Sequence, residues 1–148
     1  MREEMPMPKM FIHAPEGTFD LDARTQVASE LTELGLRCEA IPATAFVRSA
    51  VWLYFSDYPA GMVFSGGQQT SAKVMSLLVY VLEGGLDSQG KQALIAGATE
   101  ILGRHAGIEG RIPAYVCIRE VPESNWGIFG AAGSLEALRA SPEGAVPI

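Results

Sequence analysis

The chain has 148 residues, a net charge of -6 at pH 7 and 48% hydrophobic residues. This length predicts a single domain, residues 1–148, with a substantial core, and the negative charge argues against a nucleic-acid partner because no basic stripe could neutralise phosphates. The start, Met1-Arg2-Glu3-Glu4, is acidic and unlike a signal peptide, and the most apolar stretch, Val74 to Leu82, is too short to span a bilayer. We expect a cytoplasmic protein without membrane contact.

The first half predicts a strand, a helix and a second strand. The first strand should cover Lys9 to Ala14, before Pro15 and Gly17 end it. Asp20 and Asp22 would cap a helix that Pro42 closes, and its apolar stripe is Val27, Leu31, Leu34 and Cys38.

The next stretch continues with β-branched and aromatic residues from Val47 to Phe55, which predict the second strand. Met62 to Phe64 would then return as a short hairpin arm. Gln68 to Lys73 is polar and is interpreted as the linker between the halves.

The second half repeats this order. Val74 to Leu82 predicts a strand covered on both faces, because the run is almost continuously apolar. A helix should start at Asp87 or Ser88 and stop at Gly107, with Leu94, Ile95, Ala98, Ile101, Leu102 and His105 on its apolar face. After it we expect a strand over Pro113 to Glu120, a turn and arm over Pro122 to Gly130, and a brief helix from Ser134 through Ala140.

The two halves therefore resemble two copies of one structural repeat, at about residues 8–67 and 74–130, followed by a short C-terminal tail. Each unit is β-α-β, which implies parallel strands joined by a right-handed crossover. The predicted fold class is α/β, with two tandem β-α-β units forming a four-stranded sheet and two helices covering one face. The other face is too apolar to leave in water, and oligomerisation is the simplest way to cover it.

Cysteines and histidines give no sign of a metal site or a disulfide framework. Cys38 and Cys117 have apolar neighbours and are expected to pack in the core. His13 is interpreted as a packed, hydrogen-bonded strand residue, and His105 as a favourable partner for a helix C-terminus.

Pro8, six residues of strand and then Pro15-Glu16-Gly17 resemble the start of the tautomerase superfamily. The run from Pro59 to Gln69 is similar to the cis-3-chloroacrylic acid dehalogenase branch, in which two units of the oxalocrotonate tautomerase type are fused. This resemblance implies a tautomerase/MIF-like fold, three chains in a trimer, and an N-terminal proline that acts as catalytic base or nucleophile.

Most other site residues of the family are replaced in this comparison. Trp126 matches the aromatic residue that walls the tautomerase site. The positions of the family's arginines, helix histidine, strand tyrosine and water-activating glutamate carry other residues: Thr18, Gly35, Trp52, Leu82, Gly85, Tyr115, Cys117 and about Ile128. We therefore expect dehalogenase or hydratase activity to be very weak or absent.

Pro8 has two interpretations. As a terminal residue it would offer a secondary amine whose charged form is disfavoured by apolar neighbours, so that the neutral base is present near pH 7. Inside the chain its nitrogen is an amide, and it is only a strand-starting proline. The numbering places six residues before Met7, so the first interpretation needs translation from Met7 or processing of the extension, and Pro6 is another possible start.

An anionic substrate would need a cation and a shielded pocket. Arg119 is the candidate carboxylate anchor, with Arg48 and Arg111 as alternatives, because guanidinium pairs bidentately with carboxylates. Trp126 and Tyr115 are candidate pocket residues. Each has a structural alternative: a solvated or intersubunit pair for an arginine, and core or interface packing for an aromatic ring.

The sequence thus favours a tautomerase-type enzyme that transfers a proton alpha to the carbonyl of a small 2-oxo or unsaturated acid. Pro8 would be catalytic, and Arg119, Tyr115 and Trp126 would bind substrate. No cofactor or metal is implied, and the expected partners are a small carboxylate and two further copies of the chain. The alternative is a non-catalytic protein of the same fold that binds a small molecule or only assembles, which the position of Pro8 and the missing arginines favour.

Overall fold

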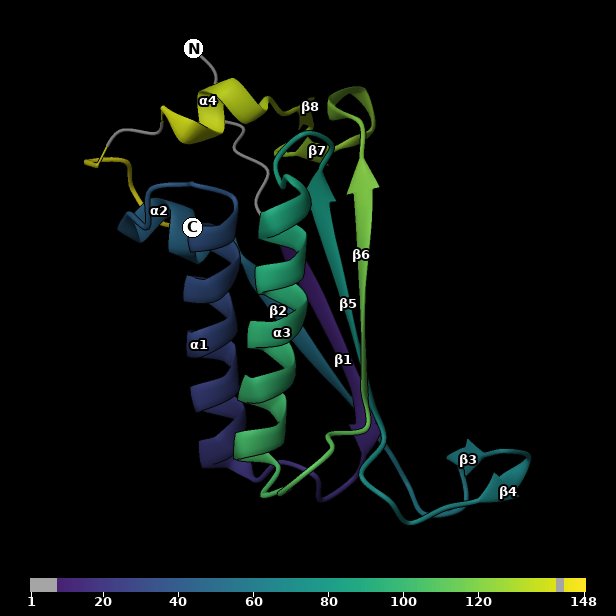
Figure 1. Cartoon of the computed structure of the whole chain (residues 1–148). Helices are drawn as coiled ribbons and strands as arrows, with labels where there is room; N and C mark the ends of the chain where they lie inside the picture. Colours follow the sequence, from purple (N-terminus) through teal and green to yellow (C-terminus); the bar gives the residue numbers. More distant parts are fainter. Residues whose placement is uncertain (1–7, 141–142) are drawn as a thin grey trace.

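A computed structural model describes residues 8–140 and 143–148 and contains a four-stranded mixed sheet with the strand order β2-β1-β5-β6 (Figure 1). The bounds of these strands are β1 Lys9–Pro15, β2 Trp52–Tyr58, β5 Met75–Leu82 and β6 Ala114–Val121. β1 pairs with β2, and β5 with β6, in parallel, while β1 and β5 run antiparallel and join the two β-α-β units. The predicted α/β fold class is confirmed.

Two long helices, α1 (Leu21–Cys38) and α3 (Ser88–His105), lie side by side on one face of the sheet. Each begins as the sequence predicts: Asp20 accepts a hydrogen bond from the Ala23 N–H, and Asp87 accepts one from the Gly90 N–H, both at 2.7 Å. These caps satisfy amide groups that a helix start leaves without partners. The main core fills the space between helices and sheet, and its fully buried members include Met10, Ile12, Val27, Leu31, Leu77, Val79, Leu94 and Leu102.

The predicted strand from Val47 to Phe55 is wrong in its first part. A short helix, α2 (Ala45–Ser49), occupies it, and β2 starts only at Trp52. The Thr44 side chain caps α2 by accepting a hydrogen bond from the Val47 N–H at 3.1 Å. Val47 and its neighbour Phe46 are buried in a second core cluster, so helical burial outweighs the strand preference of this run.

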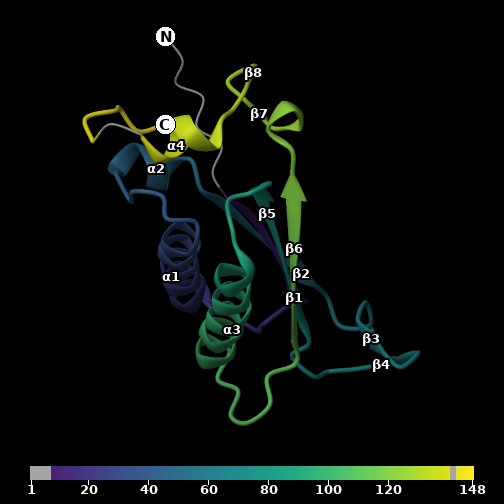
Figure 2. The ribbon, with the colours of Figure 1, turned by 45° about the horizontal axis from the view of Figure 1, so that its top comes forward.

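The predicted hairpin arm is present, but its return strand lies in the stretch interpreted as a linker. β3 (Phe64–Ser65) pairs antiparallel with β4 (Gln68–Gln69), and the arm projects beyond the sheet (Figures 1 and 2). Gly66 and Gly67 both have positive φ values, the conformation that a two-residue hairpin turn requires.

The C-terminal part follows the predicted order of turn, arm and brief helix. It consists of η1 (Glu123–Asn125), β7 (Gly127–Ile128), β8 (Ala131–Ala132) and α4 (Leu135–Arg139). Ser134 caps α4, as expected, and Leu138 is buried against α2 and the end of α1 in the second core cluster. Figure 2 shows α4 and α2 together at the end of the molecule that carries the tips of β5 and β6. This end also contains Pro8.

The face of the sheet away from α1 and α3 is not covered by any other element in the described part of the chain. β5 alternates between buried and half-buried residues, so it is covered on one face and not on both as predicted. Large apolar side chains are exposed there, among them Trp52, Tyr54 and Tyr115. No helix in the described part of the chain is long and apolar enough to cross a membrane.

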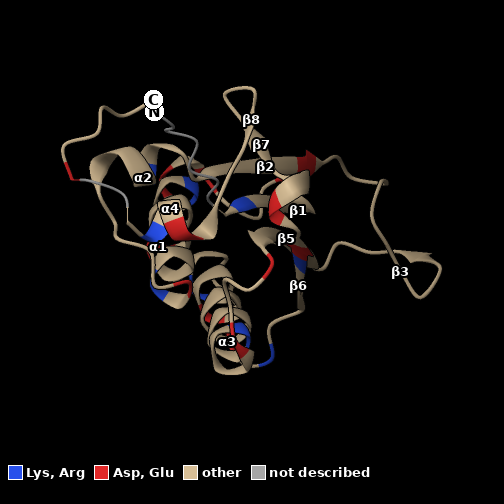
Figure 3. Ribbon diagram, turned by 90° about the horizontal axis from the view of Figure 1, so that it is seen from above, with Lys and Arg blue, Asp and Glu red and all other residues tan. Residues whose placement is uncertain are grey.

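Charged residues of both signs are intermixed along α1 and α3 (Figure 3). Arg104 of α3 joins the helices, because its Nη2 lies 2.7 Å from Glu30 Oε1 of α1. His105 Nε2 lies 2.8 Å from Glu30 Oε2. Arg104 and His105 together hold the Glu30 carboxylate charged and lower its pKa to about 2.

Candidate active site on the open sheet face

Lys9 lies at the centre of an aromatic cluster on the open face, at the start of β1. Its ammonium is 5.5 Å from the ring centre of Phe11 and 5.4 Å from those of Trp52 and Tyr54. Phe11 and Tyr54 stack with ring centres 5.2 Å apart. Because aromatic faces attract cations, this cluster holds a positive charge in a mostly apolar setting.

A cleft of about 350 Å³ opens beside Lys9, at the N-terminal end of β1. We call it the Trp126 cleft; its walls are Lys9, Phe11, Tyr80, Val121, Asn125, Trp126 and Gly127. Arg119 lies next to it, since its guanidinium is 5.9 Å from the ring centre of Tyr80 and the two residues are register partners on β6 and β5. The structure therefore brings Trp126 and Arg119, two of the predicted site residues, to one end of the sheet together with a second cation.

Pro8 immediately precedes Lys9, the predicted and observed first residue of β1. It is buried, and its Cγ lies 3.6 Å from the position that a Cβ would take at Gly35 of α1. The ring therefore packs on the helix side of the sheet, while Lys9 points to the open side. In the chain as numbered, the Pro8 nitrogen is an amide, and an amide does not act as a base near neutral pH.

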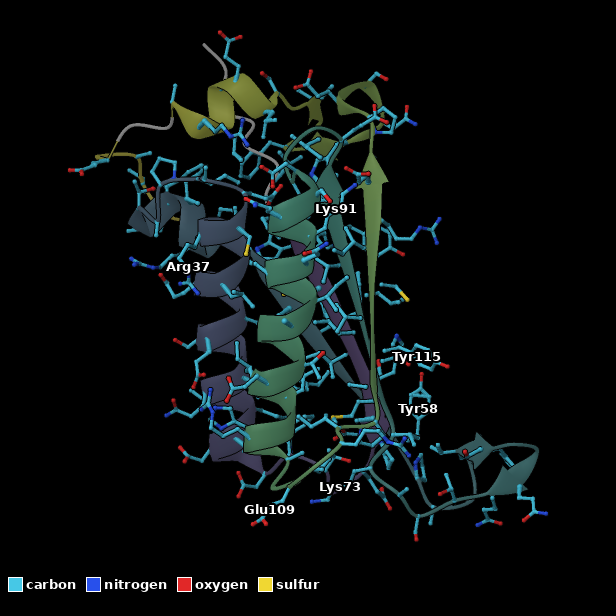
Figure 4. The ribbon with its side chains drawn as sticks, viewed as in Figure 1. Arg37, Tyr58, Lys73, Lys91, Glu109 and Tyr115 are labelled. Atoms are coloured by element: carbon cyan, nitrogen blue, oxygen red, sulfur yellow. The ribbon has the colours of Figure 1, made fainter. Side chains whose placement is uncertain are left out.

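Tyr115, the remaining predicted site residue, is at the other end of the sheet. It is 76% exposed and lines a second cleft of about 720 Å³, which we call the Tyr58 cleft. Figure 4 shows Tyr58 and Tyr115 projecting on the side away from the helices. Tyr115 and Arg119 are four positions apart on β6, which is a distance of about 13 Å. Within one chain, Tyr115 therefore does not line the Trp126 cleft.

The Tyr58 cleft contains a hydrogen-bonded pair of ring side chains. His13 Nδ1 and Tyr58 Oη are 2.7 Å apart, which agrees with the interpretation of His13 as a packed, hydrogen-bonded strand residue. Arg111, an alternative anion anchor, also lines this cleft. Arg48, the other alternative, is on α2, where its Nε donates a hydrogen bond to Glu33 Oε2 at 2.6 Å. Arg48 thus pairs with Glu33 and lines neither cleft.

The predictions for the two cysteines have different outcomes. Cys117 is exposed on β6, so its predicted place in the core is wrong, whereas Cys38 is half-buried and packs against the main core. The error arises because alternation along β6 turns residue 117 to the open face. Across residues 8–140 and 143–148, no three His, Cys, Asp or Glu side chains gather as metal ligands would.

Glu39, at the C-terminal end of α1, was not predicted as a functional residue. It is 2% exposed, and burial raises the pKa of its carboxyl to about 8 while the charge of Arg139 works in the opposite direction. The Arg139 guanidinium donates its hydrogen bonds to the backbone carbonyls of Glu39 and Gly85, and not to the carboxyl. Among the described residues, Glu39 Oε1 has no hydrogen-bond partner.

This geometry is similar to that of known proteins. Residues 77–132, which span the second β-α-β unit, match the family model described as Tautomerase enzyme. A fused 4-OT, described as a wild-type asymmetric trimer, superposes with a TM-score of 0.73 at 21% identity, over 88% of this chain and 98% of that chain. The chain therefore shares the fold of this fused 4-OT. A comparison with curated proteins gives no match.

Two further solved structures show how widely this tautomerase fold is shared. N1, a member of the cis-3-chloroacrylic acid dehalogenase family, has a TM-score of 0.71 at 22% identity, over 85% of this chain and 83% of that chain. The macrophage migration inhibitory factor of Toxoplasma gondii has a TM-score of 0.67 at 17% identity, over 84% of this chain and 98% of that chain. The resemblance stated from the sequence, including the fused arrangement, is thus confirmed for the fold.

The sequence analysis missed Lys9, Tyr80 and Glu39. Alternation placed Lys9 and Phe11 on one face of β1, and aromatic residues recur at Trp52 and Tyr54 of β2. Pairing these two strands in parallel would have revealed the aromatic cluster. No local pattern marks Glu39, because its burial depends on residues distant in the sequence.

Proposed function

We propose that this protein is a small-molecule isomerase that transfers a proton alpha to the carbonyl of a small 2-oxo acid. The observation that carries the proposal is the Trp126 cleft, where two cations and an aromatic wall lie next to the residue that matches the family proline. The acting form is a chain that begins at Pro8, in which the proline nitrogen is a secondary amine.

In this proposal the substrate carboxylate is held between Lys9 and Arg119. A guanidinium can form two parallel hydrogen bonds to a carboxylate, and an ammonium adds charge without a fixed geometry. Trp126 and Phe11 exclude water from the cleft, which strengthens these interactions. Asn125, also in the wall, offers an amide that can donate a hydrogen bond to the substrate carbonyl.

The Pro8 amine moves the proton. As a neutral base it removes the proton from the enol hydroxyl, and as an ammonium it returns a proton to the alpha carbon, so that the enol becomes the ketone and the amine is regenerated. An α-amino group has a pKa of roughly 7.7–8.0, so both forms exist near neutral pH. No cofactor takes part in these steps.

We further propose that three copies assemble into a homotrimer. The open sheet face supports this, because Trp52, Tyr54 and Tyr115 are 39%, 46% and 76% exposed and a second copy would cover them. The fused 4-OT structures that share the fold are described as trimers. Tyr115, too distant from Arg119 in its own chain, could then serve a site only in a neighbouring chain.

A second candidate is a non-catalytic protein that binds a carboxylate in the same cleft. The amide character of the Pro8 nitrogen in the numbered chain and the burial of its ring against Gly35 favour this candidate. Both candidates use the same cations, so binding alone does not separate them, whereas turnover does.

The experiment measures the ketonisation of phenylenolpyruvate, a generic enol acid, by a chain that begins at Pro8. Replacing the anchor by Arg119→Ala should raise KM about tenfold, the equivalent of about 1.4 kcal/mol of carboxylate binding. Arg48→Ala is the matched control and should leave KM unchanged, since Arg48 pairs with Glu33 and lines neither cleft. If the two variants have the same KM as the parent, Arg119 is not the anchor and the proposed site is wrong.

A further inference from the structure

Glu39 is a buried acid, and among the described residues its Oε1 has no hydrogen-bond partner. Only 2% of the residue is exposed. A carboxyl group in such surroundings is normally neutral or paired with a cation, because an isolated buried charge is expensive. Arg139, whose charge acts on this carboxyl, donates its hydrogen bonds to backbone carbonyls.

The Glu39 carboxyl lies where a side chain at position 85 would lie, and glycine at that position leaves the space free. A Cβ at Gly85 would stand 2.5 Å from Glu39 Oε2 and 3.1 Å from the Leu82 carbonyl oxygen. Glu39 thus occupies the space directly over Gly85, a position where the sequence comparison places one of the missing family arginines. The Arg139 side chain fixes this arrangement, because it bridges the carbonyl oxygens of Glu39 and Gly85 at 2.9 and 3.1 Å.

Pro8 lies at the same end of the core. Its ring packs beside Gly35. The Gly35 carbonyl accepts a hydrogen bond from the Glu39 N–H at 3.1 Å, so Glu39 lies one helical turn beyond Gly35. One turn of α-helix is about 5.4 Å, a distance that a glutamate side chain can bridge. The antiparallel register of β1 and β5 also places Pro8 near Gly85. Lys9 pairs with Tyr80, so Pro8 lies beside Val81, close to the end of β5 that leads to Gly85.

We propose that Glu39 is the positioning residue for the Pro8 amine, supplying the negative charge that holds it as an ion pair in a chain that begins at Pro8. This inference rests on the proposed function for the identity of the acting amine. The pair shares one proton: either the carboxyl is neutral beside a neutral amine, or the carboxylate faces an ammonium. The proton that passes to and from the substrate is then the one shared by Pro8 and the buried Glu39 carboxyl.

The charged and titratable groups around Glu39 do not duplicate this role. Arg139 comes from α4, Arg37 and Cys38 precede Glu39 on α1, and Asp87 caps α3 at the turn after β5. Asp87 is committed to the Gly90 N–H, and Arg139 to the two carbonyls. Among these described groups, none is a cation directed at the Glu39 carboxyl.

A nearby carboxylate favours the charged form of an amine, so Glu39 should raise the pKa of Pro8. The test labels proline with ¹⁵N in a chain that begins at Pro8 and follows the amine signal by NMR as a function of pH. Glu39→Gln should lower the pKa of the amine by about one pH unit or more, a tenfold change in its protonation equilibrium. Glu33→Gln, a substitution on the exposed part of α1, should leave it unchanged.

An amine pKa that is the same in Glu39→Gln and in the parent would overturn the inference. If Glu39→Gln does not fold, as judged by circular dichroism, Glu39→Asp is used in its place. Its side chain is one methylene shorter, so the carboxylate lies farther from the amine and the amine pKa should still be measurably lower than in the parent. No change in the aspartate variant would overturn the inference equally.

The titration needs no substrate, which separates this inference from the proposed function. An amine whose pKa depends on Glu39 in a chain without turnover supports the ion pair and refutes the isomerase. Turnover with an amine that does not sense Glu39 supports the isomerase and refutes the pair. If both hold, the acidic limb of the kcat/KM profile should move to lower pH in Glu39→Gln.

Discussion

In the variant Glu39→Gln, the free energy of unfolding should rise relative to that of the parent as the pH increases. The parent binds a proton at Glu39 more tightly when folded, since the pKa of this carboxyl rises from its ordinary value of 4.5 to about 8. Between these two pH values the folded state holds more protons than the unfolded state, so the free energy of unfolding falls with pH. Below 4.5 the effect is absent, and above 8 it is complete.

The size of the effect follows from the interval. At about 1.36 kcal/mol for each pH unit, the parent loses at most about 5 kcal/mol between pH 4.5 and 8, and relaxation of the structure will reduce this. Glutamine cannot ionise and avoids the loss. Its buried amide imposes a cost of about 1–3 kcal/mol that does not depend on pH. The difference between variant and parent should therefore change with pH by several kcal/mol.

Urea unfolding followed by tryptophan fluorescence, at pH values from 4 to 9 and one fixed protein concentration, measures this difference. Other titrating groups are shared by the two proteins and cancel in the comparison. A difference that stays constant from pH 4 to 9 would refute the reasoning, because it would mean that Glu39 ionises in the folded protein as it does in the unfolded chain.

Three other outcomes follow from the same physical arguments. Gly85→Ala should destabilise the fold by about 1–3 kcal/mol in urea unfolding, because the new Cβ displaces the carboxyl above it. Glu30→Gln should cost about 1 kcal/mol at pH 7 and less near pH 2, since the lowered pKa of Glu30 means that its pairing with Arg104 stabilises the fold above pH 4.5 and is lost as the pH falls toward 2. Turnover of cis-3-chloroacrylate, measured by halide release from the chain beginning at Pro8, should be very weak or absent, because Gly85, Cys117 and Ile128 cannot bind a carboxylate or activate water as the family's residues do.

The fold could be predicted in large part because its local signals agree with its tertiary structure. Asp20 and Asp87 mark both helix starts, and alternation defines β1. The prediction failed at Val47, where β-branched residues indicate a strand but burial beside Leu138, about ninety residues away in the sequence, stabilises a helix. A pattern confined to neighbours in the sequence does not contain that contact.

The residues that line the candidate cleft were anticipated only in part, for a related reason. Trp126, which matches a family position, and Arg119, chosen for its guanidinium, lie near one cleft, whereas Tyr115 lies at the other end of the sheet. Motif matching assigns roles without distances, whereas strand geometry places residues four apart about 13 Å from each other. Glu39 has no motif, and its importance becomes visible only when Gly85 and α4 are folded against it.

The isomerase proposal is tested most directly by the rate of phenylenolpyruvate ketonisation in two forms of the chain, one that begins at Met1 and one that begins at Pro8, each verified by intact mass. We expect the chain beginning at Pro8 to be active, Pro8→Ala in the same form to lose most of that activity, and the chain beginning at Met1 to be inactive, because its Pro8 nitrogen is an amide. A chain beginning at Met1 that is as active as the shorter form would contradict the proposed mechanism, and inactivity of both forms would leave the carboxylate-binding protein as the supported function.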